Sequence, residues 1–286
     1  MGDRNMCIKL LSRADDFGSA RCANSAIIEG LKSTQVVRNV SCMAVGAFIE
    51  EGAEELKRYK DIDVGVHLTI TSEWSGMRWG PLSDEGRKAG VTEEDGTFAR
   101  TREQLIKLNP DIPRIIKEYS RQLDLLTKMG LKIVYADSHM MPEIVIPGLA
   151  EAIREWSSNK GLLNAEEYYK LADAPIPVYS EKDEGYLENV CEWLSQLKNG
   201  EQYFYLIHPA KKDYELMLFY NSQNSPGIIC HQRNQEYIAM VSPKWNEWEK
   251  KYQLKFIRYT EAKKQKNGWS ELKKIISADK SELREE

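Results

Sequence analysis

The sequence predicts an α/β fold in which helices cover a parallel sheet, and two observations carry that prediction. Short apolar runs rich in β-branched residues alternate with longer amphipathic segments along most of the 286 residues. Such alternation is typical of either an open doubly wound sheet or a closed barrel. Neither GxGxxG nor GxxxxGKS/T follows any of the apolar runs, so the usual nucleotide-binding reason for an open sheet is missing. We therefore expect a TIM-like α/β barrel, as a single domain over residues 1–286.

The predicted elements follow one another as strands and helices. Strands are expected at residues 8–13, 37–45, 63–71, 132–139, 203–209 and 254–260, where the apolar runs are short. Helices are expected at 24–33, 47–59, 112–130, 143–156 and 185–200, where apolar residues recur at helical spacing. Asn24 is a favourable residue for the N-cap of the first helix, and Gly130 and Gly200 are natural helix ends.

One long segment, at about 71–111, interrupts this alternation. It is rich in Gly, Pro and charge and contains Trp74, Arg78, Trp79 and Phe98. Most connections in compact domains have only a few residues, so a segment of this length is usually functional or disordered. Because of its aromatic residues we expect an ordered loop on the substrate side of the fold.

Composition and charge exclude several classes of protein. Hydrophobic residues make up 42% of the chain, and 40 basic residues stand against 44 acidic ones, for a formal charge of −4. No membrane-length apolar stretch and no long basic stripe occur, so neither a membrane nor a nucleic acid is an expected partner. The basic run at 263–274 is interpreted as a solvated helix face or tail. The N-terminus has no secretory signal and the five cysteines form no CxxC pair, which predicts a cytoplasmic protein with reduced thiols.

Acids and imidazoles stand where the predicted strands end. Asp15 and Asp16 follow the first strand, and the other such residues are His67, Asp137, His139 and His208. The carboxyl ends of parallel strands converge on one face, which is where α/β enzymes place their catalytic residues. Taken singly, each histidine is more often structural, and adjacent acids are often only a helix N-cap. A shared metal site explains all of them at once.

Two imidazoles and one carboxylate form a ligand set with open positions, which suits Zn²⁺ and also Fe²⁺, Mn²⁺ or Co²⁺. Successive side chains on a strand point to opposite faces, so Asp15 and Asp16 face one cavity only if the chain turns there. Gly18 is expected to permit that turn. One acid would then bind the metal while the other stays free as a base.

Several motifs resemble the YdjC/ChbG-like carbohydrate deacetylases. They are ADDFG, SCMAVGAFIEEG, GVHLTIT, LSDEG, DGTF, EYSRQLDLLTKMG and DSH, with a later echo in LIHPA. The resemblance covers about half of the chain densely. It implies a TIM-like barrel, a divalent metal held by Asp16, His67 and His139, and Asp15 as the catalytic base. It also implies hydrolysis of N-acetyl groups from amino sugars, His208 as a catalytic histidine, and often a homodimer.

The chain departs from this family at Met141. The family usually has a further histidine two places after that of DSH, where this chain reads DSHMMPE. The departure bears on local hydrogen bonding and on the choice of substrate more than on the metal, because His139 remains.

The predicted reaction is amide hydrolysis at Mg²⁺ or Zn²⁺, of a small carbohydrate that is either phosphorylated or not. Asp15 would accept the proton of the attacking water, His208 would protonate the leaving amine, and Asp137 would orient a metal-bound imidazole. Trp74 and Trp79 would stack on sugar rings or else pin the long loop. Arg78 would bind a substrate hydroxyl or phosphate, or lie in solvent.

Three other readings remain open. A non-haem Fe²⁺ oxygenase uses the same ligand set but needs no second acid beside it. A phosphosugar hydrolase would need more basic strand-end residues than Arg13 and Lys211. A non-catalytic sugar-binding protein on a degenerate fold is the third, with Met141 as its best argument. Arg233 and Glu236 are expected to form a surface pair at helical spacing, and His231 to be a surface or structural residue.

Overall fold

Seven strands of the described chain form one parallel sheet, which gives the molecule its framework. The structure is a computed structural model that describes residues 7–172, 177–266 and 270. The strand order is β5-β4-β3-β2-β1-β6, and β7 pairs with β1. The strands are β1 (Ile8–Phe17), β2 (Asn39–Cys42), β3 (Asp63–Leu68), β4 (Ile133–Ser138), β5 (Leu163–Asn164), β6 (Gln202–Ile207) and β7 (Leu254–Ile257).

Strand β1 lies at the centre because three strands pair with it. Its first residues, Ile8 to Leu11, pair with β7, while Arg13 and Ala14 pair with β2 on the same edge. Strand β6 pairs along the other edge from Lys9 to Ala14. Neighbours on both edges bury nearly all of β1, including the polar residues Ser12 and Arg13.

The sheet curls into a half-barrel, and the predicted α/β barrel is confirmed in this distorted form. The path of paired strands runs from β5 to β6 without a ladder between these two ends in the described chain. Strand β6 instead bonds to the segment that follows β5, where Phe204 N donates to Lys170 O at 2.8 Å. All six pairings along the path and with β7 are parallel, so the carboxyl ends of the strands share one side.

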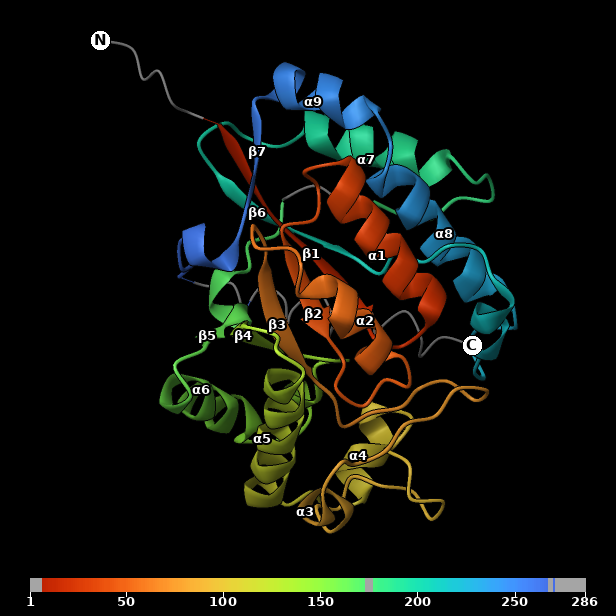
Figure 1. Ribbon diagram of the computed structural model, residues 1–286, viewed down its shortest axis with the longest axis vertical. Helices are drawn as coiled ribbons and strands as arrows, with labels where there is room; N and C mark the ends of the chain where they lie inside the picture. The colour runs from red at the N-terminus through yellow and green to blue at the C-terminus, as the bar shows by residue number, and fades with distance from the viewer. Residues whose placement is uncertain (1–6, 173–176, 267–269, 271–286) are drawn as a thin grey trace.

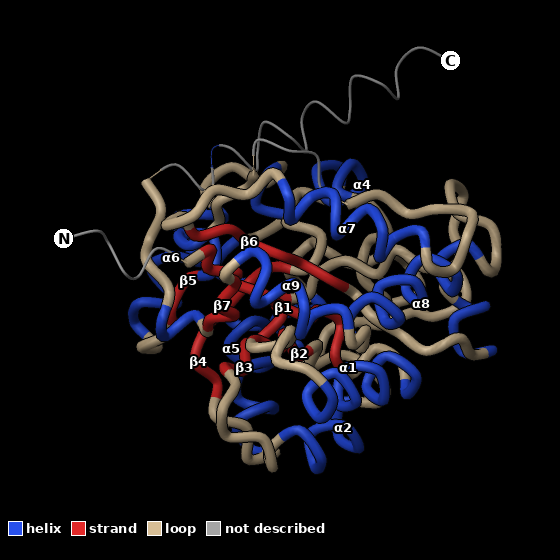
Figure 2. Tube along the Cα trace, turned by 90° about the horizontal axis from the view of Figure 1, so that it is seen from above, coloured by secondary structure: helices blue, strands red, loops and turns tan. Residues whose placement is uncertain are grey.

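Helices surround the curled sheet. Figure 1 shows α1, α7 and α8 alongside one another, with α5 and α6 on another side of the strands, and Figure 2 shows the strands in the interior. The bounds of the helices are α1 (Arg21–Ser33), α2 (Ile49–Leu56), α3 (Asp84–Arg87), α4 (Arg102–Lys107), α5 (Ile112–Lys128), α6 (Leu149–Asn159), α7 (Gly185–Ser195), α8 (Ile228–Met240) and α9 (Lys244–Tyr252). Short 3₁₀ turns occupy Pro142–Ile144, Ala165–Tyr168, Tyr214–Leu218 and Tyr259–Glu261.

The first helix starts earlier than predicted, and the expected N-cap role of Asn24 is wrong. Helix α1 begins at Arg21, so Asn24 lies inside it and is buried. Its side chain accepts a hydrogen bond from Gly18 N at 2.6 Å and donates one to Phe48 O at 3.0 Å. Asn24 therefore ties the turn after β1 to the start of α2, a long-range contact that local capping rules do not reveal.

The helix predicted at 143–156 is also divided. A 3₁₀ turn, Pro142–Ile144, comes first, and α6 starts only at Leu149. Gly148 stands between them with φ +86°, a left-handed conformation that a helix does not contain. The turn and the helix are therefore separate elements, and the turn stays beside the end of β4.

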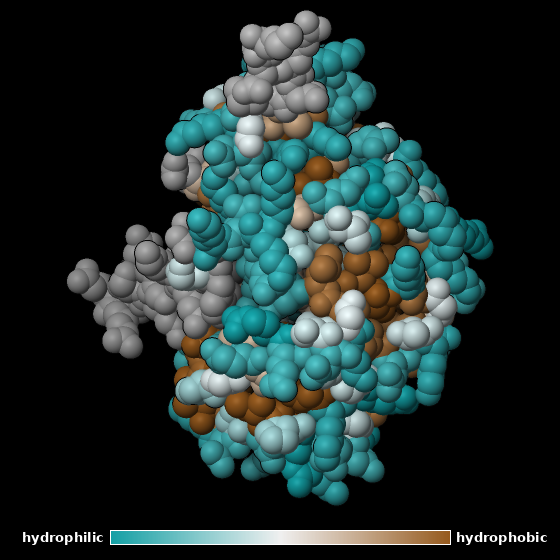
Figure 3. Space-filling model, turned by 90° about the vertical axis from the view of Figure 1, so that its left-hand side faces the viewer, coloured by the Kyte–Doolittle hydropathy of each residue, from teal (hydrophilic) through white to brown (hydrophobic). Residues whose placement is uncertain are grey.

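The outer surface is mostly polar. The face in Figure 3 is largely hydrophilic, with apolar residues gathered in two separate areas. All five cysteines are free thiols, and Cys22, Cys42 and Cys230 are buried. Among the described residues, none of the helices combines the length and hydropathy that crossing a bilayer requires. Most of the basic run at 263–274, namely 267–269 and 271–274, lies outside the described residues.

Candidate active site

A cavity of about 320 Å³ opens at the carboxyl ends of the strands, within the size range of small-molecule sites. Its wall includes residues from the ends of β1, β4 and β6, from β3, from the long loop and from α8. The strand-end candidates that line it are Asp15, Asp16, His67, His139 and His208. These five residues therefore lie around one cavity, as the sequence predicts.

Asp16, His67 and His139 form a compact buried triangle. Asp16 Oδ1 lies 3.3 Å from His139 Nδ1 and 3.5 Å from His67 Nε2, and the two nitrogens are 3.2 Å apart. Ligand atoms that share one zinc ion at about 2.0–2.2 Å lie roughly 3.0–3.5 Å from each other. The three atoms therefore have the spacing of ligands to a single cation.

A turn at Asp16 itself lets both acids face the cavity. Asp16 has φ +61°, in the left-handed region that Asp tolerates better than most residues. The pairing of β1 with β2 shifts register between Ala14 and Phe17, so the strand bulges at this point. Gly18, the predicted source of the turn, is also left-handed at φ +103° and continues it.

Each of the two acids has its own arginine, and the two contacts differ. Arg13 donates hydrogen bonds to both oxygens of Asp15, from Nε to Oδ1 at 2.6 Å and from Nη2 to Oδ2 at 2.7 Å. Arg233 contacts only one oxygen of Asp16, from Nη2 to Oδ2 at 2.6 Å. Oδ1 of Asp16 is buried and accepts no hydrogen bond from the described residues. Because this oxygen is free, Asp16 is a better candidate for a cation ligand than Asp15.

A carboxylate holds the far side of each imidazole. Asp137 Oδ2 lies 2.6 Å from His67 Nδ1, and Glu73 Oε2 lies 3.0 Å from His139 Nε2. Such a carboxylate fixes which ring nitrogen carries the proton. His67 would then present Nε2 to the centre of the triangle, whereas His139 would present Nδ1.

The electrostatics of this cluster favour a cation. Burial by itself would raise the pKa of Asp16, but Arg233 and the two imidazoles hold it well below its ordinary value. Burial would lower the pKa of His67, yet Asp137 and Asp15 raise it to about 10. Burial would likewise lower the pKa of His139, which Glu73 and Asp16 raise to about 9.

The formal charges lead to the same conclusion. The raised pKa values keep both imidazoles charged at neutral pH when no metal is bound. Metal binding requires neutral imidazoles, and four carboxylates against two guanidinium groups then leave two negative charges, which a divalent cation would balance. These groups are Asp15, Asp16, Glu73 and Asp137 against Arg13 and Arg233. The donor set and its charge therefore fit a divalent metal ion.

A second trio with metal-ligand spacing, Asp15, His67 and Asp137, overlaps the first. A guanidinium already occupies its acidic side, because Arg13 Nη2 lies 3.2 Å from Asp137 Oδ2 as well as binding Asp15. Arg13 remains charged, since Asp137 and Asp15 raise its pKa although burial lowers it. The first triangle is therefore the better place for a metal ion.

The expected surface pair of Arg233 and Glu236 is wrong, because both residues are buried. Arg233 binds Asp16, and Glu236 accepts hydrogen bonds from His208 N at 2.5 Å and from Tyr179 Oη at 2.8 Å. Both residues therefore support the cavity. His231 is half-buried, with Nε2 2.8 Å from Ser180 O, as expected for a structural residue.

Comparisons with known proteins agree with this site. The family model of the YdjC-like proteins matches residues 9–251. The chain belongs to the YdjC-like family. A carbohydrate deacetylase of Oceanobacillus iheyensis is 24% identical over 82% of this chain and 97% of its own length. A carbohydrate deacetylase of Brevibacillus brevis is 30% identical, but the match covers only 46% of this chain and about half, 49%, of that protein.

A solved structure shares the fold of this YdjC-like chain. It is a protein of Enterococcus faecalis V583 that has been assigned to cellobiose-phosphate cleavage. The two structures superimpose with a TM-score of 0.69 over 89% of this chain and 98% of that one, at 19% sequence identity. At that identity the likeness establishes the fold alone.

The long loop of this YdjC-like protein reaches the cavity through Glu73 and Trp74. Trp79 does not line the cavity: its Nε1 donates to Thr71 O at 2.6 Å, and its ring lies 6.0 Å from the ring of His139. Arg78 does not line it either. Its guanidinium donates to Ser72 O and Phe98 O and pairs with Glu93. Of the two alternatives for Trp79, the contact with Thr71 O corresponds to the one in which it pins the loop. Arg78 is neither in the cavity wall nor free in solvent, because its contacts hold the loop together.

Sequence reasoning missed Glu73 and Arg233 and underestimated Arg13. Arg13 had a detectable signal, because residues two apart on a strand share a face and Arg13 precedes Asp15 by two. Glu73 stands in an irregular segment, and Arg233 in a polar helix far along the chain. No local spacing connects these two residues with the strand ends.

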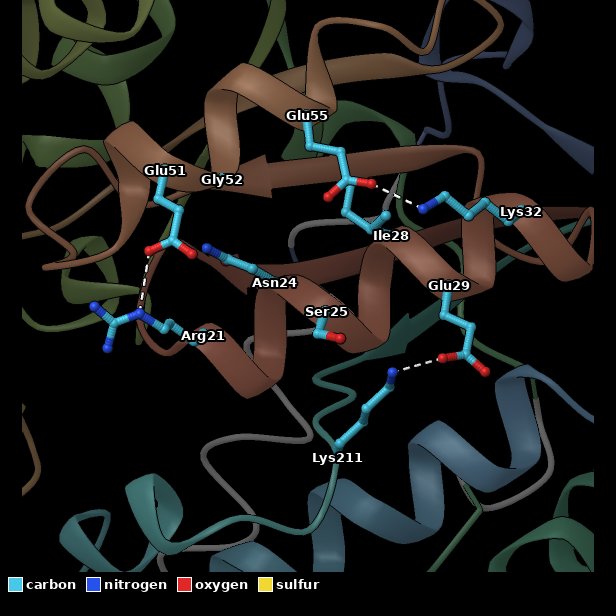
Figure 4. Close-up of a pocket in the computed structure, with 10 residues that line it drawn as sticks. All are labelled: Arg21, Asn24, Ser25, Ile28, Glu29, Lys32, Glu51, Gly52, Glu55 and Lys211. Atoms are coloured by element: carbon cyan, nitrogen blue, oxygen red, sulfur yellow. Dashed lines mark hydrogen bonds and ion pairs between the residues drawn. The ribbon is translucent and has the colours of Figure 1, made fainter.

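A second hollow of about 250 Å³ lies beside α1 and α2, and its charged lining residues form ion pairs. Figure 4 shows Arg21 with Glu51, Lys32 with Glu55, and Lys211 with Glu29. Arg21 and Lys32 are more than half exposed, and such pairs contribute little. The YdjC-like chain therefore places its unusual electrostatics in the strand-end cavity.

Proposed function

We propose that this YdjC-like protein is a metal-dependent carbohydrate deacetylase, which hydrolyses the N-acetyl group of an amino sugar or a short chitooligosaccharide. The triangle of Asp16, His67 and His139 carries this proposal, because it offers three buried ligand atoms 3.2–3.5 Å apart beside a second carboxylate. The Oceanobacillus and Brevibacillus relatives, both named carbohydrate deacetylases, support it.

Asp16 Oδ1, His67 Nε2 and His139 Nδ1 would hold the metal, either Zn²⁺ or Mg²⁺. A divalent ion bound there would supply a Lewis acid for the acyl carbonyl and would lower the pKa of a water molecule from about 15.7 toward 7. Asp137 and Glu73 keep the two rings in the required orientation. Arg233 keeps Oδ2 of Asp16 occupied, so that Oδ1 faces the ion.

Asp15 would accept a proton from the attacking water. Its Oδ2 lies 4.0 Å from His67 Nε2, so it reaches the space in front of the triangle. The fork of Arg13 fixes its orientation, while each carboxylate oxygen retains a lone pair to accept a further hydrogen bond. Proton transfer by a positioned base typically contributes about 10²- to 10⁴-fold in rate.

His208 would give a proton to the departing amine. It follows β6 and lines the same cavity, and Glu236 fixes its backbone N–H. His208 comes from the end of β6 and His139 from the end of β4, so the two residues reach the cavity from different strands. The acid and the metal ligands would therefore both reach the scissile amide.

The rival readings have weaker support. The paired acids Asp15 and Asp16 have no use in a non-haem iron oxygenase, whose ligand set needs only one. A phosphosugar hydrolase would need free cations, but Arg13 and Arg233 are already paired with these two acids. A degenerate sugar-binding protein would have no reason to keep the complete buried cluster.

Acetate release from a panel of N-acetylated sugars tests the proposal. Chelated protein would be resupplied in parallel with Zn²⁺, Mg²⁺, Mn²⁺ or Co²⁺, and N-acetylglucosamine, its 6-phosphate and chitobiose would be offered to each sample. We expect acetate only after metal is returned. Metal-loaded protein that releases no acetate from any of these sugars would overturn the deacetylase assignment, and protein that binds no metal would overturn the site. The cytoplasmic location and the homodimer stay predictions.

A further inference from the structure

We propose that this enzyme prefers N-acyl sugars whose acyl chain is longer than acetyl, and that Met140 and Met141 help to receive the chain. The inference rests on the proposed deacylase function and specifies its substrate class. It depends on the chemistry of the cavity wall outside the metal cluster, which differs from what a sugar with many free hydroxyls requires.

The wall outside the cluster is mainly apolar. The apolar and aromatic residues that line it include Met140, Met141, Phe204, Leu206, Tyr179 and Ile229. Large apolar side chains also stand exposed close by in the sequence: Val178, beside Tyr179, is 64% exposed, and Ile228, beside Ile229, is 42% exposed. An apolar cavity wall of this kind indicates an apolar ligand group.

Few polar groups are left to bind sugar hydroxyls. The hydroxyl of Tyr169 accepts a hydrogen bond from Arg13 at 2.6 Å, and that of Tyr179 donates to Glu236 at 2.8 Å. Among the described lining residues, the polar side chains that remain are those of Ser138, Gln232 and His208. Two donors, Trp74 Nε1 and Arg233 Nη1, are also buried there without a partner in the described chain. Each substrate hydroxyl buried without a partner would weaken binding, so the apolar part of the wall suits a substituent without hydroxyls.

The two methionines lie where an acyl group would extend. They directly follow His139, so they stand next to the cluster at which the acyl carbonyl would bind. Both have left-handed backbones, with φ +56° at Met140 and +45° at Met141, a conformation uncommon for such residues. Met140 is 41% exposed. Unbranched methionine side chains adapt readily to an apolar partner.

Position 141 is also where the chain departs from the motif of its family. A histidine there would add a polar group to the cavity wall, whereas Met141 adds an apolar one. Leu206 and Ile229 add further apolar surface to the same cavity. The departure and the rest of the wall therefore agree in favouring an apolar acyl substituent.

The test is a series of N-acyl glucosamines with acetyl, butanoyl, hexanoyl and octanoyl groups, in which release of the free amine is measured with metal-loaded protein. We expect kcat/KM to rise by about fourfold for each methylene that the wall buries, and hexanoate to inhibit more strongly than acetate. A kcat/KM that is highest for the acetyl sugar overturns the inference but leaves the deacetylase. Hydrolysis of none of the four overturns the proposed function itself.

A variant pair locates the preference. Met141→His should reduce the ratio of hexanoyl to acetyl kcat/KM at least fivefold, and histidine tolerates the left-handed conformation better than most residues. Met217→His is the control, because Met217 is 40% exposed and does not line the cavity. An unchanged ratio in folded Met141→His protein would overturn the role of Met141. Octyl N-acetylglucosaminide carries its apolar chain at the anomeric end of the sugar instead of on the acyl group. If this octyl group raises kcat/KM more than a longer acyl chain does, the inference is overturned.

Discussion

The strand ends and the long loop both contribute to the metal cluster, but different forces hold their residues in place. His67 and Asp137 are register partners on β3 and β4, and His139 N bonds to Leu68 O at 3.0 Å, so the backbone ladder sets their spacing. Glu73 lies outside the strands of the sheet, in a loop held by isolated backbone bonds, such as Ser72 N to Ala99 O at 2.8 Å, and by the side-chain contacts of Arg78. The residues on the strands are therefore positioned by the sheet, whereas Glu73 is positioned by contacts within its loop.

The largest effects are expected at the strand end that holds the two acids. Asp16→Ala should abolish metal binding and activity, because it removes the carboxylate oxygen that lies 3.3 Å from His139 Nδ1 and 3.5 Å from His67 Nε2. Asp15→Asn should keep the metal and lower kcat by about 10²- to 10⁴-fold. Metal content by mass spectrometry and acetate release measure both effects. If Asp15→Asn loses metal as fully as Asp16→Ala does, the division of roles between the two acids is wrong.

The next effect compares the two carboxylates behind the imidazoles. Asp137→Asn on the strand and Glu73→Gln on the loop should each weaken metal binding by about 10- to 100-fold, because each removes the charge that orients a ring. A competition titration with a chelating dye gives the affinity without reference to turnover. Glu94→Gln, an exposed acid in the same loop, is the control and should not change it. A normal affinity in Glu73→Gln would mean that the loop only covers the site.

The residues of this site that follow strands could be predicted from the sequence, and those on the loop and on helix α8 could not. Asp16, His67 and His139 could be predicted because parallel strands bring their carboxyl ends together whatever the helices do. Helix α8 could not be predicted in the same way, since its polar residues Arg233 and Glu236 have the spacing of a surface pair. They are buried because they bond to Asp16 and to His208 N. These partners are distant in the sequence, so the hydrophobic periodicity of the helix cannot predict the contacts.

A smaller effect is expected from loosening the loop. Arg78→Ala removes the donor to Ser72 O and Phe98 O and should cost about 1–3 kcal/mol of stability, because these buried carbonyls lose their partner. Metal affinity should fall less than in Glu73→Gln. Chemical denaturation with and without metal measures both quantities. Arg87→Ala, which removes an exposed pair with Asp84, is the matched control, and equal losses in the two variants would contradict the proposed role of Arg78.

The smallest effect is expected where charges of the same kind lie in water. Arg21 and Glu51 are 59% and 66% exposed, as side chains, whereas Arg13 and Asp15 are 4% and 3% exposed. Water screens the exposed pair, so Arg21→Ala should leave the melting midpoint and acetate release unchanged within error. Arg13→Ala should impair activity strongly, because it leaves Asp15 and Asp137 buried without their cation. A loss of activity in Arg21→Ala would show that the hollow beside α1 and α2 takes part in function, and that burial does not decide which of these ion pairs matters.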